Sequence, residues 1–338
     1  MDIKENYSLK RHNTFGMNVS CRFFAQTHND EEILQLLSTK RFEKFKKLVI
    51  GIGSNILFTK DFDGLVITQM QNKIYISDTT SEYTFITAEA GAIWNDVVNF
   101  CVQRNLGGIE NLALIPGKVG AAPIQNIGAY GQELKDVFYS LNGILVDDLK
   151  LMQLNKSDCE FGYRASVFKN KFKNRFIITD ITLKLNNMPT PNLDYGILAE
   201  KLSVFDPAEL TIKHVSDAVC EIRKSKLPDP QILGNAGSFF KNPEITEAHF
   251  TKLNKLNPNL RGFKISENKY KISAAWLIEK IGFKGKKIGN VGVHSEQPLV
   301  LVNFGGAMPN ELIELKEKIK REVNIKFDIL LEEEVNLI

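Results

Sequence analysis

The segment "KLVIGIGSNILF" (47–58) most constrains the fold, because a glycine-rich turn separates two apolar runs with the pattern of strands. A dinucleotide-binding βαβ unit needs G-x-G-x-x-G followed by a helix, whose N-terminus holds the pyrophosphate. Ile56 stands where the third glycine would be, and the residues after it are typical of a strand. The segment therefore argues against a doubly wound Rossmann domain.

The same turn still has the composition of an anion-binding loop. Its small residues Gly51, Gly53, Ser54 and Asn55 can form a nest of backbone N–H groups for phosphate oxygens. A β-turn without a ligand is the alternative for this stretch considered alone.

A second loop, "IPGKVGAAPIQNIGAYGQE" (115–133), favours cofactor binding. Four glycines, three alanines and two prolines occur in its 19 residues, so its main chain can approach a large flat ligand. Gln125 and Asn126 add amide donors and acceptors. Four apolar residues are expected to flank a ring system: Ile115, Val119, Ile124 and Ile127.

The remaining pattern predicts an α+β protein of two or three domains, since helices and strands do not alternate regularly over the 338 residues. The "KLPDPQ" segment (226–231) is the main predicted boundary. Ser273 is a candidate N-cap and Gly282 a stop signal. Helices are expected at 31–38, 92–104, 214–224, 273–282 and 310–323, and strands at 62–67, 83–91, within 141–186 and at 298–305.

Composition excludes several functions. The net charge of +3 is far below that of a nucleic-acid-binding face. The four cysteines form no C-x-x-C pair and have no nearby histidine, so no metal site is expected. The first residues, "MDIKENYSLKRHNTF", contain no apolar run of the kind a signal peptide needs, and no apolar run of the chain is long enough to span a membrane. We expect a cytoplasmic monomer without nucleic-acid partners or membrane insertion.

The stretch "GNAGSFFKN" (234–242) places one hydroxyl, that of Ser238, among small residues and before two phenylalanines. This serine is a candidate turn residue, phosphate contact, nucleophile or proton donor. No G-x-S-x-G elbow is present, which argues against a nucleophile.

The motifs together resemble the UDP-N-acetylenolpyruvoylglucosamine reductase (UDP-N-acetylmuramate dehydrogenase) family, in its longer type with a tyrosine-bearing loop. They occur in the family's order between residues 13 and 335. The matching stretches are "NTFG" (13–16), "GIGSNILF", "IPGKVGAAPIQNIGAYGQE", "FGYRASVFK" (161–169), "NLDYG" (192–196), "KLPDP", "GNAGSFFKNP" (234–243), "KISAAWLIEKIGFKG" (271–285), "GVHSEQPLVLVN" (292–303) and "LEEEV" (331–335).

The resemblance implies an FAD-binding region of the vanillyl-alcohol-oxidase-like (PCMH) type, built from two α+β subdomains, and a C-terminal α+β substrate domain. It implies subdomains at 1–75 (joined by a strand at 328–338) and 76–225, and a substrate domain at 226–327. The implied cofactors are non-covalent FAD and NADPH. The implied reaction reduces the enolpyruvyl group of UDP-N-acetylglucosamine enolpyruvate to UDP-N-acetylmuramate, for peptidoglycan synthesis.

The resemblance also implies three catalytic residues. Arg164 orients and stabilises the substrate carboxylate, a task that suits a planar guanidinium. Ser238 donates a proton to the carbon that bears the carboxylate. Glu334 matches the family's glutamate because it precedes Val335, and Glu333 is the alternative in the run of three glutamates. Alternation along a strand would put Glu332 on the same side as Glu334.

Two further sets of residues follow from the resemblance. The substrate-binding set is Tyr163, Tyr195, Lys226, Asn242 and Gln297. The cofactor-binding set is Gly51, Gly53, Ser54, Asn55, Ile115, Pro116, Gly117, Gly120, Ala121, Asn126, Gly128 and Ala129.

Two other functions compete with this interpretation. Another oxidase or dehydrogenase of the same flavin superfamily would be expected to lack the serine–arginine–glutamate set. A nucleotide-sugar-binding regulatory protein would bind the substrate without turning it over.

Overall fold

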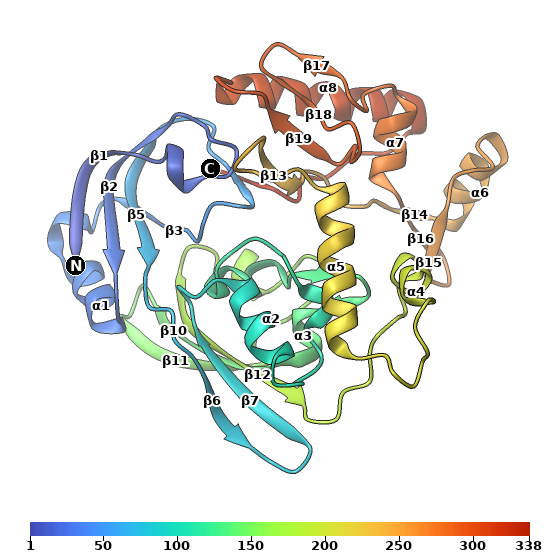
Figure 1. The fold of residues 1–338 in the computed structure, drawn as a ribbon. Helices are drawn as coiled ribbons and strands as arrows, with labels where there is room; N and C mark the ends of the chain where they lie inside the picture. The colour runs from blue at the N-terminus through green and yellow to red at the C-terminus, as the bar shows by residue number, and fades with distance from the viewer. The chain divides into compact units, whose positions relative to one another are not determined.

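A computed structural model describes residues 1–338 (Figure 1). The chain forms two compact units. Unit 1 comprises Met1–Tyr7, Cys21–Ile52 and Asp63–Ser225, and unit 2 comprises Ser8–Ser20, Gly53–Phe62 and Lys226–Ile338. Both units combine helices and sheets, so the predicted α+β class is confirmed. The three-part division of the chain stays a prediction.

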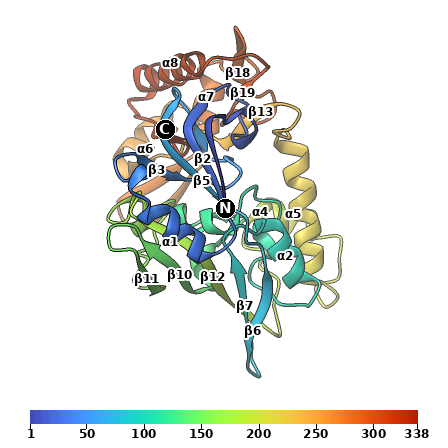
Figure 2. The same ribbon diagram turned by 90° about the vertical axis from the view of Figure 1, so that its left-hand side faces the viewer.

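The first sheet of unit 1 has the strand order β1-β2-β5-β3, with β3 parallel to β5. Its strands are β1 (Asp2–Ser8), β2 (Ser20–Thr27), β3 (Lys46–Val49) and β5 (Phe62–Gln69). Helix α1 (Asp30–Ser38) lies beside this sheet (Figure 2). Asn29 caps its N-terminus, because the Asn29 side chain accepts a hydrogen bond from the N–H of Glu32. Its buried face, with Ile33 and Leu36, packs against Phe23 of β2.

The second sheet of unit 1 has the order β11-β10-β12-β7-β6, and every neighbouring pair is antiparallel. Its strands are β6 (Ile74–Thr79), β7 (Tyr83–Glu89), β10 (Phe138–Leu145), β11 (Lys150–Asn155) and β12 (Phe176–Asn186). The helices of this region are α2 (Trp94–Val102), α3 (Leu134–Val137), α4 (Gly196–Leu202) and α5 (Ile212–Lys226).

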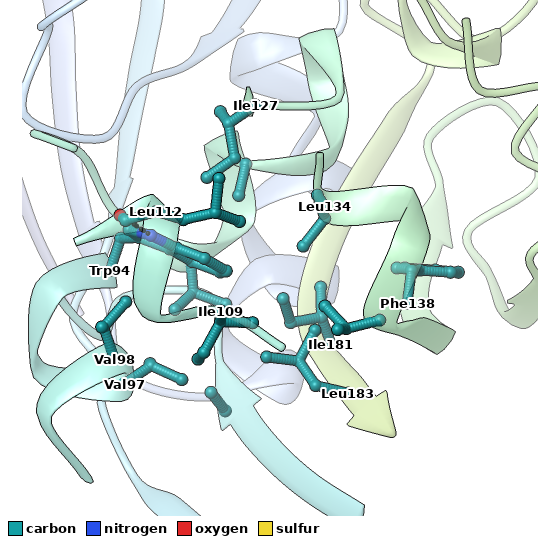
Figure 3. Close-up of a cluster of buried hydrophobic side chains, with 14 of the residues drawn as sticks. Trp94, Val97, Val98, Ile109, Leu112, Ile127, Leu134, Phe138, Ile181 and Leu183 are labelled. Carbon is teal, nitrogen blue, oxygen red and sulfur yellow. Dashed lines mark hydrogen bonds between the residues drawn. The ribbon is translucent and has the colours of Figure 1, made fainter. Parts of the chain in front are cut away.

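One hydrophobic core joins these helices to the second sheet (Figure 3). Trp94 and Val97 of α2 lie in the same cluster as Ile181 and Leu183 of β12. The indole Nε1 of Trp94 donates to the carbonyl of Leu112 at 3.0 Å, which satisfies a buried polar atom. Val119 and Ile127 of the second glycine-rich loop belong to the same core, which therefore anchors the loop.

The second glycine-rich loop folds into short turns instead of long elements. The 3-10 turns η3 (Glu110–Leu112), η4 (Val119–Ala121) and η5 (Pro123–Gln125) precede a small hairpin of β8 (Gly128–Ala129) and β9 (Gln132–Glu133). Other 3-10 turns are η1 (Lys10–His12), η2 (Lys40–Phe42) and η6 (Val167–Lys169). Much of the loop's backbone therefore lies outside α-helices and long strands.

Unit 2 contains two sheets and a parallel strand pair, β4 (Ile56–Leu57) with β20 (Asn336–Leu337). One sheet has the order β13-β19-β18-β17 and the other β14-β16-β15. The remaining strands are β13 (Gly234–Ser238), β14 (Glu244–Thr246), β15 (Gly262–Ser266), β16 (Lys269–Ile272), β17 (Lys287–Ile288), β18 (Val291–Val293) and β19 (Val300–Asn303).

Three helices complete unit 2: α6 (Glu247–Leu256), α7 (Ala274–Lys280) and α8 (Pro309–Phe327). The predicted N-cap is confirmed, because the Ser273 side chain accepts from the N–H of Trp276 at 3.2 Å. Helix α8 buries the apolar stripe that its sequence predicts, including Leu312 and Ile319. None of the helices in the structure combines the length and apolarity needed to cross a membrane.

Candidate functional site

Unit 1 contains a cavity of about 80 Å³ at which the two glycine-rich loops meet. Gly51 follows β3, whereas Gly120 and Ala121 belong to η4. A Cβ atom on Gly120 would lie 2.8 Å from the Cβ of Ala90, and one on Gly51 would lie 3.3 Å from the Cβ of Lys118. These close approaches give a physical reason for glycine at both positions.

Backbone hydrogen bonds hold the second loop at this cavity. The N–H of Gly120 donates to the carbonyl of Ala90 at 3.0 Å, and that of Val119 donates to Ala92 at 2.9 Å. Other parts of the wall come from Gln69 at the end of β5 and from the start of β12. The loop is therefore an ordered part of unit 1.

Lys118 is a wall residue that the sequence reasoning did not select. Its Nζ donates to the carbonyl of Gln69 at 2.5 Å and to the hydroxyl of Thr68 at 3.3 Å. Burial lowers the pKa of this ammonium group. Its position inside "IPGKVG", between the predicted cofactor residues Gly117 and Gly120, is the sequence signal that could have identified it. The cavity thus has one fixed cationic group in its wall.

The four apolar loop residues do not share one environment. Ile124 lines the cavity, and Ile115 is partly buried against the core. Val119 and Ile127 are buried in the core itself. The expectation that all four flank a ring system is therefore wrong for Val119 and Ile127, because their side chains pack into the protein.

Asn126 connects the second glycine loop to the segment that carries Arg164. It is fully buried in the left-handed region, at φ 45°. Its Nδ2 donates to the carboxylate of Glu133 at 3.0 Å and to the carbonyl of Gly162 at 3.1 Å, while its Oδ1 accepts from the N–H of Lys135 at 2.9 Å. The structure therefore uses this predicted cofactor-binding amide to hold two loops together.

Arg164 and Tyr163 lie next to the end of that loop. Arg164 occupies the left-handed region, at φ 51°, within a turn closed by paired backbone bonds between Gly162 and Ala165. Its Nη2 donates to the carbonyl of Gly128 at 2.9 Å, and its guanidinium carbon lies 5.6 Å from the centre of the Tyr163 ring. The structure thus brings together Gly128, Tyr163 and Arg164 from the predicted sets.

The predicted loop tyrosine, Tyr195, precedes helix α4 and is 48% exposed. Its ring meets the ring of Tyr130 edge-on, with centroids 5.4 Å apart. Tyr130 has φ 49°, and burial raises the pKa of its phenol. Sequence reasoning did not select Tyr130, although it lies two residues after Gly128.

Gly53 and Asn55 belong to the part of the first glycine turn that lies in unit 2, and they contact other residues of unit 2. Gly53 has φ +73°, and a Cβ atom there would lie 2.2 Å from the carbonyl oxygen of His12. Asn55 donates through Nδ2 to the carbonyl of Glu334 at 3.3 Å, and its own carbonyl accepts from the N–H of Asn336 at 3.0 Å. This turn therefore anchors the C-terminal segment.

Ser238 is the last residue of β13, and it is paired with Val300 of β19 after a bulge. Gly237 before it has φ +69°, a conformation that favours glycine. Phe239 and Phe240 after it are 0% and 1% exposed. The two rings pack into unit 2, and they fix the end of the strand on which the hydroxyl is carried.

The C-terminal glutamates lie alongside the residues that follow Ser238. The N–H of Glu334 donates to the carbonyl of Phe239 at 2.8 Å, and Phe240 pairs with Glu333 in an antiparallel bridge. The N–H of Lys241 donates to the carbonyl of Glu332 at 2.9 Å. The backbone of Glu334 is therefore bonded to Phe239, the residue that follows Ser238.

Glu333 is distinguished from its neighbours by two lysines of α8. Its Oε1 accepts from Nζ of Lys316 at 2.7 Å and of Lys320 at 2.9 Å. Burial raises the pKa of Glu333, but the hydrogen bonds from both lysines outweigh it and bring the pKa to about 2. Glu332 has a different partner, Lys241, at 3.1 Å.

The other predicted substrate residues occupy varied positions. Asn242 accepts from the N–H of Ala274 at 3.0 Å, next to the start of α7. Gln297 is half-buried, and its carbonyl accepts from the N–H of Val300 at 2.9 Å in the turn before β19. Lys226 is exposed at the end of α5. Substrate contacts of these residues stay predictions.

Two parts of the chain match known protein families, and the whole chain matches named reductases. Residues 22–148 match an FAD-binding domain, and residues 229–338 match the C-terminal domain of UDP-N-acetylenolpyruvoylglucosamine reductase. A reductase of that name from Flavobacterium johnsoniae is 43% identical over 340 residues, which is 100% of both chains. Its counterpart from Amoebophilus asiaticus is 44% identical, again over 100% of both chains. The chain belongs to the UDP-N-acetylenolpyruvoylglucosamine reductase family.

A solved structure has the same fold. The crystal structure of the reductase from Thermus caldophilus aligns with 99% of this chain and 98% of its own, with a TM-score of 0.70 and 22% identity. The predicted combination of an FAD-binding region and a C-terminal domain is thereby confirmed.

Proposed function

We propose that this protein uses NADPH and FAD to reduce UDP-N-acetylglucosamine enolpyruvate to UDP-N-acetylmuramate, a step in the synthesis of peptidoglycan precursors. The observation that carries the proposal is the cavity of unit 1. Both glycine-rich loops line it, and both lie within the residues that match an FAD-binding domain. Full-length relatives named for this reduction support the choice of substrate.

The residues around the cavity fit FAD. Cβ atoms at Gly51 and Gly120 would crowd Lys118 and collide with Ala90, so glycine at these positions lets the backbone segments around the cavity pack closely together. Lys118 offers a half-buried cation that suits a diphosphate. We assign the holding of FAD in unit 1 to Gly51, Gly120 and Ala121, with Lys118 as an added contact. Bound FAD supplies a hydride carrier between NADPH and the substrate.

The chain's own residues must stabilise the negative charge that develops on the substrate and donate a proton to it. The reduction adds hydride to the terminal carbon of the double bond and a proton to the carbon bearing the carboxylate, while negative charge develops toward that carboxylate. Arg164 supplies the guanidinium that orients and stabilises the carboxylate. The bond from its Nη2 to Gly128 supports this role, because it fixes the planar group in one direction.

Ser238 supplies the proton from its hydroxyl, and Glu334 is the catalytic glutamate of the same unit. The hydrogen bond from the N–H of Glu334 to the carbonyl of Phe239, next to Ser238, supports this assignment. The engagement of Glu333 with Lys316 and Lys320 favours Glu334 over Glu333 for the catalytic role. Tyr163, Tyr195, Lys226, Asn242 and Gln297 are assigned to the sugar nucleotide, with Lys226 toward its diphosphate.

We further propose that the enzyme acts as a cytoplasmic monomer on small-molecule substrates. Light scattering of the holoenzyme tests the oligomeric state, since a monomer has the mass of 38.2 kDa plus FAD. A mass of twice that value would refute the monomer without affecting the proposed reaction.

Anaerobic absorbance spectroscopy tests the reaction. NADPH should bleach the visible flavin band of the purified protein, and the enolpyruvyl sugar nucleotide should restore it without oxygen. Restoration by oxygen alone would favour an oxidase of the same superfamily. Binding of the sugar nucleotide without restoration would favour a non-catalytic binding protein, and a colourless protein that cannot be reconstituted with FAD would contradict the whole proposal.

A further inference from the structure

Lys316 of α8 is unusual among the lysines because it is only 6% exposed. Burying an ammonium group is unfavourable unless anionic partners compensate for its lost hydration. Lys316 has two such partners, Glu333 at 2.7 Å and Glu317 at 2.6 Å. Because Glu317 is its neighbour on the same helix, the bond to Glu333 is the one that links α8 to the C-terminal segment.

Lys320 makes the same link one helical turn later. Its Nζ lies 2.9 Å from the same oxygen, Oε1 of Glu333. The side chains of Glu333 and Lys320 are 21% and 26% exposed, so solvent screens these ion pairs less than pairs on an open surface. We call the three residues Lys316, Lys320 and Glu333 the α8 clamp.

The α8 clamp acts on a segment that Asn55 and the pairing of β20 with β4 also anchor, on the C-terminal side of the glutamates. Three consecutive glutamates occupy 332–334, so a slip by one residue would put another glutamate in place of Glu334. Side chains of a strand alternate between faces, and a one-residue slip therefore reverses every side chain. The pairing of this segment with Phe239–Lys241 is short and ends within a few residues.

We propose that Lys316 and Lys320, acting through Glu333, are positioning residues that hold the backbone of Glu334 in place beside the end of the strand of Ser238. The inference rests on the proposed function, in which Glu334 is catalytic. The clamp makes Glu333 a structural glutamate, and Glu332 is engaged separately by Lys241. Glu333 thus has a structural role that helps to position Glu334.

The test separates the two half-reactions of the holoenzyme by stopped-flow absorbance. The variants are Glu333→Gln, which keeps the side-chain shape, and Lys316→Met, which leaves Glu333 with Lys320. Lys316→Arg is the conservative variant for rescue. Lys318→Met is the matched control, because it removes an exposed lysine from the same helix.

We expect both clamp variants to slow flavin reoxidation by the sugar nucleotide by about 10- to 100-fold, as small misplacements of a catalytic group do. Flavin reduction by NADPH should stay within about twofold of the wild type, and Lys316→Arg should recover most of the reoxidation rate. Lys318→Met should behave like the wild type in both half-reactions.

Three results would overturn the inference. One is reoxidation at the wild-type rate in both clamp variants. Another is an equal loss of both half-reactions together with a loss of bound flavin, which indicates a merely structural role. The third is full activity of Glu334→Gln, since no catalytic glutamate would then need positioning. Failure of the wild type to be reoxidised by the sugar nucleotide would instead refute the proposed function, and the clamp inference would fall with it.

Discussion

Replacing Gly120 by alanine should weaken FAD binding, because the added methyl group would collide with Ala90 at the wall of the cavity. The new Cβ would lie 2.8 Å from the Cβ of Ala90 and 3.4 Å from both the Cα and the carbonyl oxygen of that residue. Carbon atoms in ordinary contact are about 3.5–4.0 Å apart, so η4 would have to move by roughly 1 Å. Such overpacking costs about 1–3 kcal/mol of folding free energy.

The same displacement moves the wall of the 80 Å³ cavity, because Gly120 and Ala121 line it. We therefore expect the FAD dissociation constant of Gly120→Ala to rise by at least about tenfold, which corresponds to about 1.4 kcal/mol. The assay is a titration of flavin-free protein with FAD, followed by flavin fluorescence. Thermal unfolding of the flavin-free protein measures the stability loss separately, and we expect Tm to fall by about 2–8 °C.

Gly196→Ala is the matched control. A Cβ at Gly196 would meet no atom within 4 Å, and the residue begins helix α4. This variant should be neutral or stabilised by up to about 1 kcal/mol, with unchanged FAD affinity. Wild-type stability and FAD affinity in Gly120→Ala, or equal losses in both variants, would refute the assignment of the cavity wall.

Four further predictions follow from individual contacts. Ser238→Ala should leave flavin reduction by NADPH intact and slow reoxidation by the sugar nucleotide at least about 100-fold, by loss of the proton donor; equal reoxidation rates in stopped flow would exclude that role. Arg164→Lys keeps the charge but loses the planar fork, so reoxidation should slow by about 10- to 100-fold, whereas a wild-type rate would show that charge alone suffices. The folded pKa of Glu333, about 2, lies below its ordinary value of 4.5. Its carboxylate therefore stabilises the fold above about pH 4.5, and up to about 3 kcal/mol is lost as pH falls toward 2. The urea-unfolding difference between wild type and Glu333→Gln should shrink between pH 5 and pH 3, and a constant difference would contradict the ion pairing. Trp94→Phe leaves the buried carbonyl of Leu112 without its indole donor, which should cost about 1–3 kcal/mol in urea unfolding, and an unchanged midpoint would show that the bond contributes nothing.

The sequence predicted elements whose signals are local. The helix of 273–282 was predicted from the Ser273 cap and the Gly282 stop, and both signals occur in the structure, with Gly282 at φ +77°. The helix of 310–323 was predicted from its apolar stripe, and it extends from Pro309 to Phe327. Capping groups and helical periodicity act within a few residues, so one segment contains enough information.

Elements that depend on distant partners were not predicted. The Gly234–Ser238 segment forms strand β13, although glycine disfavours strands, because β19 offers its edge for pairing. The β14–β16 sheet and helix α6 were also missed. Their strands are three to five residues long, too short for a pattern of alternation to stand out.

The candidate site shows the same division. The glycine loops were recognisable as candidates because their composition is local. The role of Lys118 depends on the distant carbonyl of Gln69, and that of Glu333 on α8. No spacing in the sequence records such contacts. The resemblance to a family contributed the catalytic roles, which composition and periodicity did not contain.

Product analysis tests the central claim most directly. The protein, NADPH and UDP-N-acetylglucosamine enolpyruvate are incubated without oxygen, and the sugar nucleotide is analysed by mass spectrometry and proton NMR. The account predicts that one NADPH is oxidised for each sugar nucleotide that gains two hydrogens, with the enolpyruvyl signals replaced by those of a lactyl ether. An unchanged sugar nucleotide, with NADPH consumed only when oxygen is admitted, would contradict the account.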